Sequence, residues 1–337
     1  MIKKAPTLRD VAERAGVSRM AVSAVLNNLQ STVRVSEATR ERIFAAMEDL
    51  RYQPDVTARS LRRQKTDTIG FYNGNGYIDL FDPFAPNIFL GLQSAAAAFS
   101  NHILLYNGFH LKERDIVLGK LLSNKADGVV VWPSPSDEDL IRRLGETGKP
   151  IIQLAEAYDG APGVVTDDYA CARLLAEHLW DRGHRSILFR RRLTPLKSEI
   201  LRYQAFADVA AERGMTLLTT FPADLVDGLT GREKDLIRGH AGPGGFTAIA
   251  CWRDASAARA MRFCAQCGIR IPADLAVTGY DGFALPEFSE DHRPTTVVVD
   301  WHRVAVQCVE LLIDRVAGRE IPDRTVVPGT LRMGTTS

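Results

Sequence analysis

The chain has 337 residues, of which 45% are hydrophobic and 25% are charged, and its formal net charge is +1. The length fits one large domain or two to three ordinary ones, and the composition is typical of a soluble globular protein. No apolar run reaches membrane-spanning length and MIKKAPTLRD contains no hydrophobic signal region, which argues against a membrane-spanning or exported chain and predicts a cytoplasmic one.

The positive charge is concentrated at the N-terminus. Residues 1–65 hold 13 Lys and Arg against 7 Asp and Glu, so the rest of the chain is mildly acidic. A small basic domain on an acidic body predicts that only the first domain meets a polyanion. The alternative is a basic face that is simply solvated.

The segment that begins at Thr7 predicts a helix, a tight turn and a second helix. Thr7 and Asp10 have the spacing of a capping box, Gly16 suits the left-handed end of the first helix, and Ser18 suits the cap of the second. The inward face is apolar at helical spacing: Leu8, Val11, Ala12, Ala15, Val22, Val25 and Leu26. The outer end of the second helix presents Arg19, Met20, Ser23 and Ala24, where a recognition helix meets base edges in a major groove.

A third helix is predicted from Ser36 through Leu50, with Ile43, Met47 and Leu50 facing inward. The short segment DVTARSLRR follows, and Asp55 could cap a helix there. So short a helix is not stable alone in water. It needs a second copy of itself or a DNA groove to stay ordered.

From Thr68 onward, apolar runs of strand length alternate with helical stretches. The predicted strands are TIGFY, ILLYNG, GVVVW, PIIQLA, SILF, LLTTF, TAIACW, LAVTGYD and TTVVVD. The helical stretches include 87–99, 170–182, 199–213, 255–267 and 304–317. This alternation predicts parallel sheets with helices on both faces. Because the pattern restarts after Val165, we expect two doubly wound α/β subdomains that meet in a cleft.

Several motifs resemble those of the LacI/GalR (lactose-repressor) family of bacterial transcription regulators. They are TLRDVAERAGVS, VLN, VSEATRERI, LRYQP and ARSLRR before TIGF, and in the core VVTDDYACARLLAEHLWDRGHRSI, IPADLAVTGYDG, RPTTV and AGREIPDRTVVPGTLRMG. The resemblance covers the whole chain. It implies a helix-turn-helix DNA-binding domain over 1–54, a hinge helix and linker over 55–66, and a periplasmic-binding-protein-like core over 67–337.

The resemblance also divides the core. The N-subdomain would comprise about 67–166 and 294–323, and the C-subdomain about 167–293 and 324–337, with crossings near Thr166, Arg293 and Arg324. Crossings of this kind make a hinge, so that closure on a ligand is a rigid-body motion.

The family's mode of action implies a palindromic operator, bound by a dimer with one recognition helix per half-site. Arg19 is the expected base contact because its fork reads guanine O6 and N7, while Met20 and Ala24 would touch base edges. Thr7, Ser18, Ser23, Asn27 and Arg40 would contact phosphates. The hinge leucine would be Leu61, wedged into the minor groove with Arg62 and Ala58 beside it. Asp55 replaces the family's usual Asn, which predicts slightly weaker DNA affinity.

The resemblance implies a small-molecule effector, a sugar or sugar derivative, beyond the carboxyl ends of the strands. The effector-binding residues it implies are Phe84, Asn87, Asp168, Arg202 and Asp281, to which the strand-end aromatics Trp132 and Trp252 are added. Each assignment has an alternative: an Asp at a strand end often caps the next helix, and an aromatic there often packs in the core.

Two departures from the family pattern bear on the effector. Arg190-Arg191-Arg192 follows SILF where small residues are usual, and Arg253 replaces the first residue of an Asn-Asp pair. On a strand Arg190 and Arg192 would share a side, and guanidinium groups at a cleft favour a carboxylate or phosphate on the ligand. The alternative is that they pair with Asp167, Asp168 or Asp281, or lie in a dimer surface.

Other functions are weaker hypotheses. Cys264-Ala-Gln-Cys267 has metal-like spacing, but no second pair or His partner accompanies it, so no metal is expected, and no cofactor is expected either. Five cysteines without an export signal predict reduced thiols. His184 lies near Asp181, but no nucleophile elbow or P-loop accompanies it, which argues against an enzyme. A transport-type binding protein conflicts with the DNA-binding segment. No leucine heptad follows LRMGTTS, which predicts a dimer rather than a tetramer.

Overall fold

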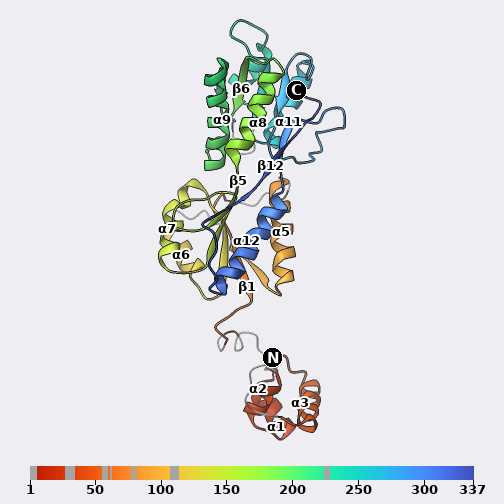
Figure 1. The fold of residues 1–337 in the computed structure, drawn as a ribbon. Helices are drawn as coiled ribbons and strands as arrows, with labels where there is room; N and C mark the ends of the chain where they lie inside the picture. The colour runs from red at the N-terminus through yellow and green to blue at the C-terminus, as the bar shows by residue number, and fades with distance from the viewer. Residues whose placement is uncertain are drawn as a thin grey trace. The chain divides into compact units, whose positions relative to one another are not determined.

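The computed structural model describes residues 6–26, 35–54, 60, 63–76, 80, 82–106, 114–223 and 228–337. The chain divides into two compact units, residues 1–66 and 67–337. The first unit is helical and the second is α/β, as the ribbon in Figure 1 shows. None of the helices in these ranges is long and apolar enough to cross a membrane.

The first unit contains α1 (Leu8–Ala15), α2 (Arg19–Leu26) and α3 (Glu37–Leu50). The predicted capping box is present, since the Thr7 side chain accepts from the Asp10 amide and the Asp10 carboxylate accepts from the Thr7 amide at 2.7 Å. Gly16 is left-handed with φ 64°, and Ser18 Oγ accepts from the Ala21 amide at 3.2 Å. The helix-turn-helix prediction is therefore confirmed in its local detail.

A small core holds these helices together. Its buried members come from all three helices and from the segment after the third: Val11, Ala12, Ala15, Val22, Val25, Ile43, Ala46 and Tyr52. The four remaining apolar residues predicted to face inward, Leu8, Leu26, Met47 and Leu50, pack against this core while partly exposed. The opposite faces stay in solvent.

The first sheet of the second unit has six parallel strands in the order β11-β5-β4-β3-β1-β2. Their bounds are β1 Thr68–Asn73, β2 His102–Tyr106, β3 Gly128–Trp132, β4 Ile151–Leu154, β5 Gly163–Thr166 and β11 Arg324–Val327. Alternate side chains face opposite layers. Phe71 and Val130 pack with α5 (Phe84–Ala98) and α12 (Trp301–Val316), and Tyr72 and Val131 pack with α6 (Arg114–Leu121) and α7 (Glu138–Glu146).

The second sheet has four parallel strands in the order β7-β6-β8-β9. Their bounds are β6 Ser186–Arg190, β7 Thr216–Thr220, β8 Ala248–Cys251 and β9 Ala276–Thr278. Ile187 and Phe189 face α8 (Asp168–Asp181) and α9 (Lys197–Arg213), whereas Leu188 faces α10 (Gly231–Arg238) and α11 (Asp254–Gln266). Two parallel sheets covered on both faces confirm the predicted fold class.

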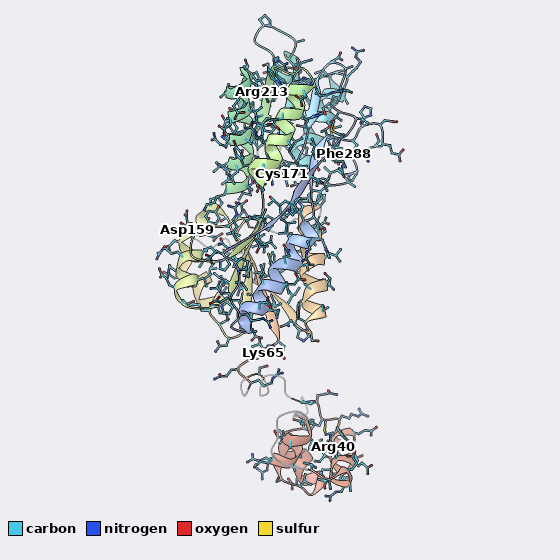
Figure 2. The ribbon with its side chains drawn as sticks, in the orientation of Figure 1. Arg40, Lys65, Asp159, Cys171, Arg213 and Phe288 are labelled. Atoms are coloured by element: carbon cyan, nitrogen blue, oxygen red, sulfur yellow. The ribbon has the colours of Figure 1, made fainter. Side chains whose placement is uncertain are left out.

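The six-stranded sheet and its helices form the first lobe of the second unit, and the four-stranded sheet and its helices form the second lobe. A two-stranded antiparallel ribbon of β10 (Thr296–Val299) and β12 (Gly329–Arg332) lies where the two lobes connect. It runs between the labelled α12 and α8 regions in Figure 1. Cys171 of α8, labelled in Figure 2, approaches β12 so closely that a Cβ on Gly329 would lie 2.9 Å from its sulfur. Glycine is therefore required where helix and ribbon touch.

The ribbon corrects two of the predicted crossing points. β11 belongs to the first sheet, so the crossing predicted near Arg324 comes later, at the turn before Gly329. β10 forms a parallel bridge from Val298 to Asp281 in the second lobe, so the crossing predicted near Arg293 comes after Val299. The short strands β5, β11 and β12 were not predicted, because four-residue segments such as RTVV carry little periodic signal.

Candidate functional site

The first candidate surface is the exposed N-terminal end of α2. Val22 and Val25 are buried in the core of the first unit, which turns Arg19 and Met20 outward, and Met20 is 69% exposed. Ser23 and Ala24 are half-buried on the flank of the same helix. A short helix whose outer end carries a charged, an apolar and two small side chains has the shape and chemistry needed to enter a major groove.

The other residues predicted to contact DNA have different placements. Thr7 uses its hydroxyl in the capping box, donating to Asp10 at 2.8 Å, yet remains exposed. Arg40 lies on α3, labelled in Figure 2, with its Nε 3.7 Å from the Glu37 carboxylate. Asn27, Ala58, Leu61 and Arg62 lie outside the described residues, as does Asp55.

The second candidate site is a cavity of about 360 Å³ in the α/β unit. Strands of both sheets end at it, since Trp132 closes β3, Trp252 follows β8 and Arg192 follows β6. The lining residues are Asn75, Asp82, Phe84, Ala85, Trp132, Ala155, Glu156, Arg192, Leu196, Ser198, Arg202, Trp252, Arg253, Asp281 and Trp301. A cavity at the carboxyl ends of parallel strands from two sheets is the expected place for a ligand in such folds.

Aromatic rings form much of the cavity wall. The Phe84 ring lies 4.7 Å from the Trp132 ring and 4.7 Å from the Trp301 ring, measured between centroids. Trp252 contributes a fourth ring from the second lobe. Flat apolar faces with polar groups at their edges suit the stacking of a sugar or another ring. Trp301 was missed from the sequence, although it directly follows the predicted strand TTVVVD.

Arg202 is held rigidly at the base of the cavity. Its Nε donates to Asp168 Oδ1 at 2.8 Å, its Nη1 donates to the Trp252 carbonyl at 2.7 Å, and its guanidinium lies 3.5 Å from the Tyr280 ring centroid. Arg202 is 4% exposed and lines the cavity. Asp168 is not among the lining residues, so the structure places it behind Arg202 as the partner that orients the guanidinium.

Asp281 lines the cavity from an unusual backbone conformation, with φ 110°. The turn is held by Asp254, whose carboxylate accepts from the Gly282 and Phe283 amides at 2.7 and 2.8 Å and from the Thr296 hydroxyl at 2.7 Å. Burial raises the pKa of Asp281 well above its ordinary value, and the nearby Arg202 guanidinium, 3.9 Å away, opposes that rise. The position of Asp281 is therefore fixed by the protein before any ligand arrives.

Glu156 was also missed, although it directly follows the predicted strand PIIQLA, as Trp301 directly follows TTVVVD. Its carboxylate accepts from the Ser198 hydroxyl and, at 3.2 Å, from the Ser198 amide at the start of α9. Burial raises the pKa of Glu156 to about 7. This pair joins the first lobe to the second beside the cavity, and Lys197 Nζ adds a bond to the Ala157 carbonyl at 3.0 Å.

Arg190 is not a cavity residue, which corrects the prediction made for it. It is 1% exposed, and its Nε donates to Glu233 of α10 at 2.7 Å while its Nη1 donates to Ser256 Oγ at 2.6 Å. Strand β6 ends at Arg190, whose side chain shares the α10 and α11 side with Leu188. Because the strand alternation stops there, Arg190 and Arg192 do not share a side.

The other arginines that depart from the family pattern also differ in their placement. Arg191 forms two bonds to the buried Glu199, at 2.8 and 3.0 Å, and does not line the cavity. Arg192 and Arg253 do line it, with guanidinium carbons 5.7 and 4.9 Å from the centroid of the Trp252 ring. The carboxylate partners found are therefore Glu233 and Glu199, with Asp82 beside Arg253, rather than Asp167 or Asp281.

Asn87 is not a lining residue either. Its side-chain amide donates to the Pro83 carbonyl at 2.8 Å, which satisfies the first turn of α5 instead of facing a ligand. His184, the candidate for acid–base chemistry, bonds through Nδ1 to Thr247 Oγ1 at 2.8 Å and has its pKa lowered by burial. Within the described ranges, no group of three or more His, Cys, Asp or Glu side chains could hold a metal ion.

Comparison with known proteins adds independent information on both units. The model of bacterial regulatory proteins of the lacI family matches residues 7–55, and the model of a periplasmic binding protein-like domain matches residues 176–337. The HTH-type transcriptional regulator GalR of Escherichia coli (strain K12) is 29% identical over 328 residues, covering 95% of this chain and 92% of GalR. The HTH-type transcriptional repressor PurR of Photobacterium profundum is 30% identical over 319 residues, covering 92% of each chain.

Solved structures agree with these similarities. The lac repressor dimer bound to operator and the anti-inducer ONPF has a TM-score of 0.82 at 24% identity, and the match covers 99% of each chain. The complex of the transcriptional regulator CelR with cellobiose has a TM-score of 0.69 at 26% identity, covering 98% of this chain and all of that one. Both matches extend over the helical unit and the α/β unit together.

Proposed function

This chain belongs to the LacI family of bacterial regulatory proteins, and from that premise we propose that it binds a palindromic operator as a homodimer and responds to a sugar-like effector. The family assignment already makes it a DNA-binding transcriptional regulator with an effector-binding core, and not an enzyme or a transport-type binding protein. Operator geometry, oligomeric state and effector class are the parts that we propose.

The exposed end of α2 supports the operator contact. Arg19 would read a guanine through its fork, and Met20 and Ala24 would touch base edges apolarly. Ser18, Ser23, Thr7, Asn27 and Arg40 would bind phosphates, which position the domain without reading sequence. Leu61, with Ala58 and Arg62, would enter the minor groove at the centre of the site.

The first lobe of the core offers a surface for a second copy. β2 is an edge strand of the six-stranded sheet, and its Leu105 is 42% exposed beside Ile116 of α6, which is 44% exposed. Edge strands with exposed apolar side chains favour pairing with another chain. The similar lac repressor structure is described as a dimer on its operator, which favours the same assembly here.

The lining of the cavity supports the proposal of a sugar-like effector. Its single most informative feature is the combination of three aromatic side chains from the first lobe with Arg202 and Asp281 from the second. A ring stacked on the aromatic wall would place its hydroxyl groups against a fixed donor and a fixed carboxyl group. A ligand that touches both lobes favours one arrangement of the lobes over another. If DNA binding favours one of these arrangements as well, the two binding events are coupled, by about 1–3 kcal/mol in typical proteins. The CelR structure with cellobiose favours a sugar.

Selection of duplexes from random DNA by the full chain tests the operator proposal. We expect recovery of a palindrome, a steep loss of affinity with salt, and an Arg19→Ala variant that loses about 1–3 kcal/mol of discrimination at one base position. Leu61→Ala should reduce DNA bending while the salt-dependent background remains. Recovery of no preferred sequence, or of sites without dyad symmetry, would contradict the proposal.

A further inference from the structure

We propose that the effector carries an anionic group, a carboxylate or a phosphate, and that Arg192 and Arg253 bind this group beside Trp252. The inference deepens the proposed function and rests on it, because it names the chemistry of the ligand in the same cavity. It concerns three adjacent lining residues that neither the aromatic wall nor the Arg202–Asp281 pair explains.

The two guanidinium groups converge on one ring. Arg192 leaves the end of β6 and Arg253 leaves the start of α11, yet their guanidinium carbons lie 5.7 and 4.9 Å from the same indole centroid. Two neighbouring strand ends thus deliver two cations to one end of the cavity. An aromatic face partly shields them from water, which strengthens their attraction for an oxyanion.

The structure already contains a carboxylate at this place. Arg253 forms an ion pair with Asp82, which lies before α5 in the other lobe, and both residues line the cavity. Arg192 donates to the Thr194 carbonyl, a neutral acceptor. A ligand carboxylate or phosphate makes stronger, charge-assisted bonds than a carbonyl does, and its geometry suits two guanidinium forks. Asp82 therefore marks where the ligand's anion binds.

The other arginines nearby are committed to other partners. Arg202 is tied to Asp168 and to the Trp252 carbonyl, and Arg190 and Arg191 point away to Glu233 and Glu199. Arg192 and Arg253 bring positive charge to the cavity wall. A neutral sugar does not require that charge in order to bind. The cavity volume of about 360 Å³ holds a sugar ring together with a carboxylate or phosphate substituent.

Burial weakens the negative charge of two of the three carboxyl groups in the lining. Three guanidinium groups (Arg192, Arg202 and Arg253) face three carboxyl groups (Asp82, Glu156 and Asp281). Burial raises the pKa of Glu156 to about 7 and raises the pKa of Asp281 well above its ordinary value. Both shifts lower the negative charge that these two carboxyl groups set against the Arg192 and Arg253 guanidinium groups.

Calorimetric titration of the full chain with matched sugars tests the inference. The probes are galactose against galacturonate, and glucose against glucuronate and glucose 6-phosphate, so that the carboxylate and phosphate sources are separated. Arg192→Gln and Arg253→Gln remove one charge each. Arg238→Gln is the matched control, because Arg238 is exposed on α10, pairs with Asp235 of the same helix at 3.0 Å and does not line the cavity. Operator binding of every variant is measured alongside.

At least one acidic sugar should bind about tenfold or more tighter than its neutral counterpart, and each cavity variant should lose roughly that factor while the control does not. Neutral-sugar binding should stay within about twofold in all variants. Equal binding of neutral and acidic sugars, an unchanged ratio in both cavity variants, or no binding by any acidic probe overturns the inference. Normal operator binding in that case leaves the proposed function intact, whereas its absence in the wild type overturns the regulator itself.

Discussion

Arg190 and Arg192 are two residues apart in the sequence, yet they occupy opposite kinds of environment. Arg190 is 1% exposed and closed into a network with Glu233 and Ser256. Arg192 lies on the wall of a solvent-accessible cavity beside Trp252. The first arrangement belongs to the fold of the second lobe, and the second is available to a ligand. Residue type and local spacing therefore do not separate a structural arginine from a binding one.

The difference arises where β6 ends. As long as the strand continues, side chains alternate, and Leu188 and Arg190 both face α10 and α11. After Arg190 the chain leaves the sheet, so Arg192 follows the loop rather than the pleat. Charge is tolerated inside the lobe only because Glu233 supplies a matched carboxylate at 2.7 Å.

Arg190→Met should give the largest effect, a loss of about 3–5 kcal/mol in the free energy of unfolding, because Glu233 would remain buried without its cation. Denaturant unfolding with a probe in the α/β unit measures this change. Selectivity for acidic sugars in the folded variant should not change. A second substitution, Glu233→Met on the Arg190→Met background, should recover most of the loss. A stability equal to wild type in Arg190→Met would show that the buried pair does not hold the lobe together.

Much of the architecture follows from the sequence because its signals are local. The capping box at Thr7, the left-handed Gly16 and the strand runs all depend on residues a few positions apart. Placing a ligand site at strand ends is a rule of the fold class, and it selected Trp132, Trp252 and Asp281, which do line the cavity.

The remaining features depend on distant partners. Arg253 meets Asp82 across 171 positions, and Arg190 meets Glu233 across 43, so no spacing rule indicates either pair. Asp168 and Arg202 were both predicted to contact the ligand, but their mutual ion pair places Asp168 behind Arg202. Glu156 needed only the strand-end rule applied once more, and its contact with Ser198 is again a tertiary one.

Buried carboxyl groups differ in the same way, and the difference affects how stability depends on pH. Glu233 has a guanidinium partner, whereas Glu156 is buried against the Ser198 hydroxyl and amide with no ion pair among the described residues. Burial raises its folded-state pKa to about 7 from 4.5. The folded protein then binds more protons than the unfolded one between those values, so stability falls as pH rises through this window and remains lower above it.

Glu156→Gln should remove that loss. We expect the variant and wild type to unfold alike near pH 4.5, and the variant to become more stable by on the order of 1–3 kcal/mol above about pH 7. Asp254, whose pKa burial also raises to about 7, titrates in both proteins and does not affect the difference. Denaturant midpoints across this range give the measurement, with the exposed Glu320→Gln as control. A constant difference at all pH values would show that Glu156 is already ionised in the folded protein.

Asp82→Asn probes the cavity side with a smaller effect. Removing the carboxylate takes away the competitor for Arg253 while the Asn oxygen can still accept from the Phe84 amide, which Asp82 now does at 3.0 Å. Acidic sugars should therefore bind about three- to tenfold tighter, and neutral sugars should be unaffected. Titrations like those for the arginine variants measure both. Weaker binding of acidic sugars in Asp82→Asn would mean that Asp82 contacts the ligand rather than competing with it.

Arg142→Gln should have the smallest effect, although Arg142 has closer partners than Arg190. Its guanidinium lies 2.5 Å from Asp139 and 2.6 Å from Glu146 on the surface of α7, and its side chain is 55% exposed. Water and salt screen an exposed pair, and holding long side chains in one geometry costs conformational entropy, so the gain in stability is slight. We expect a denaturant midpoint that is indistinguishable from wild type at physiological salt. A loss comparable to that of Arg190→Met would mean that distance, rather than burial, decides what an arginine contributes to this fold.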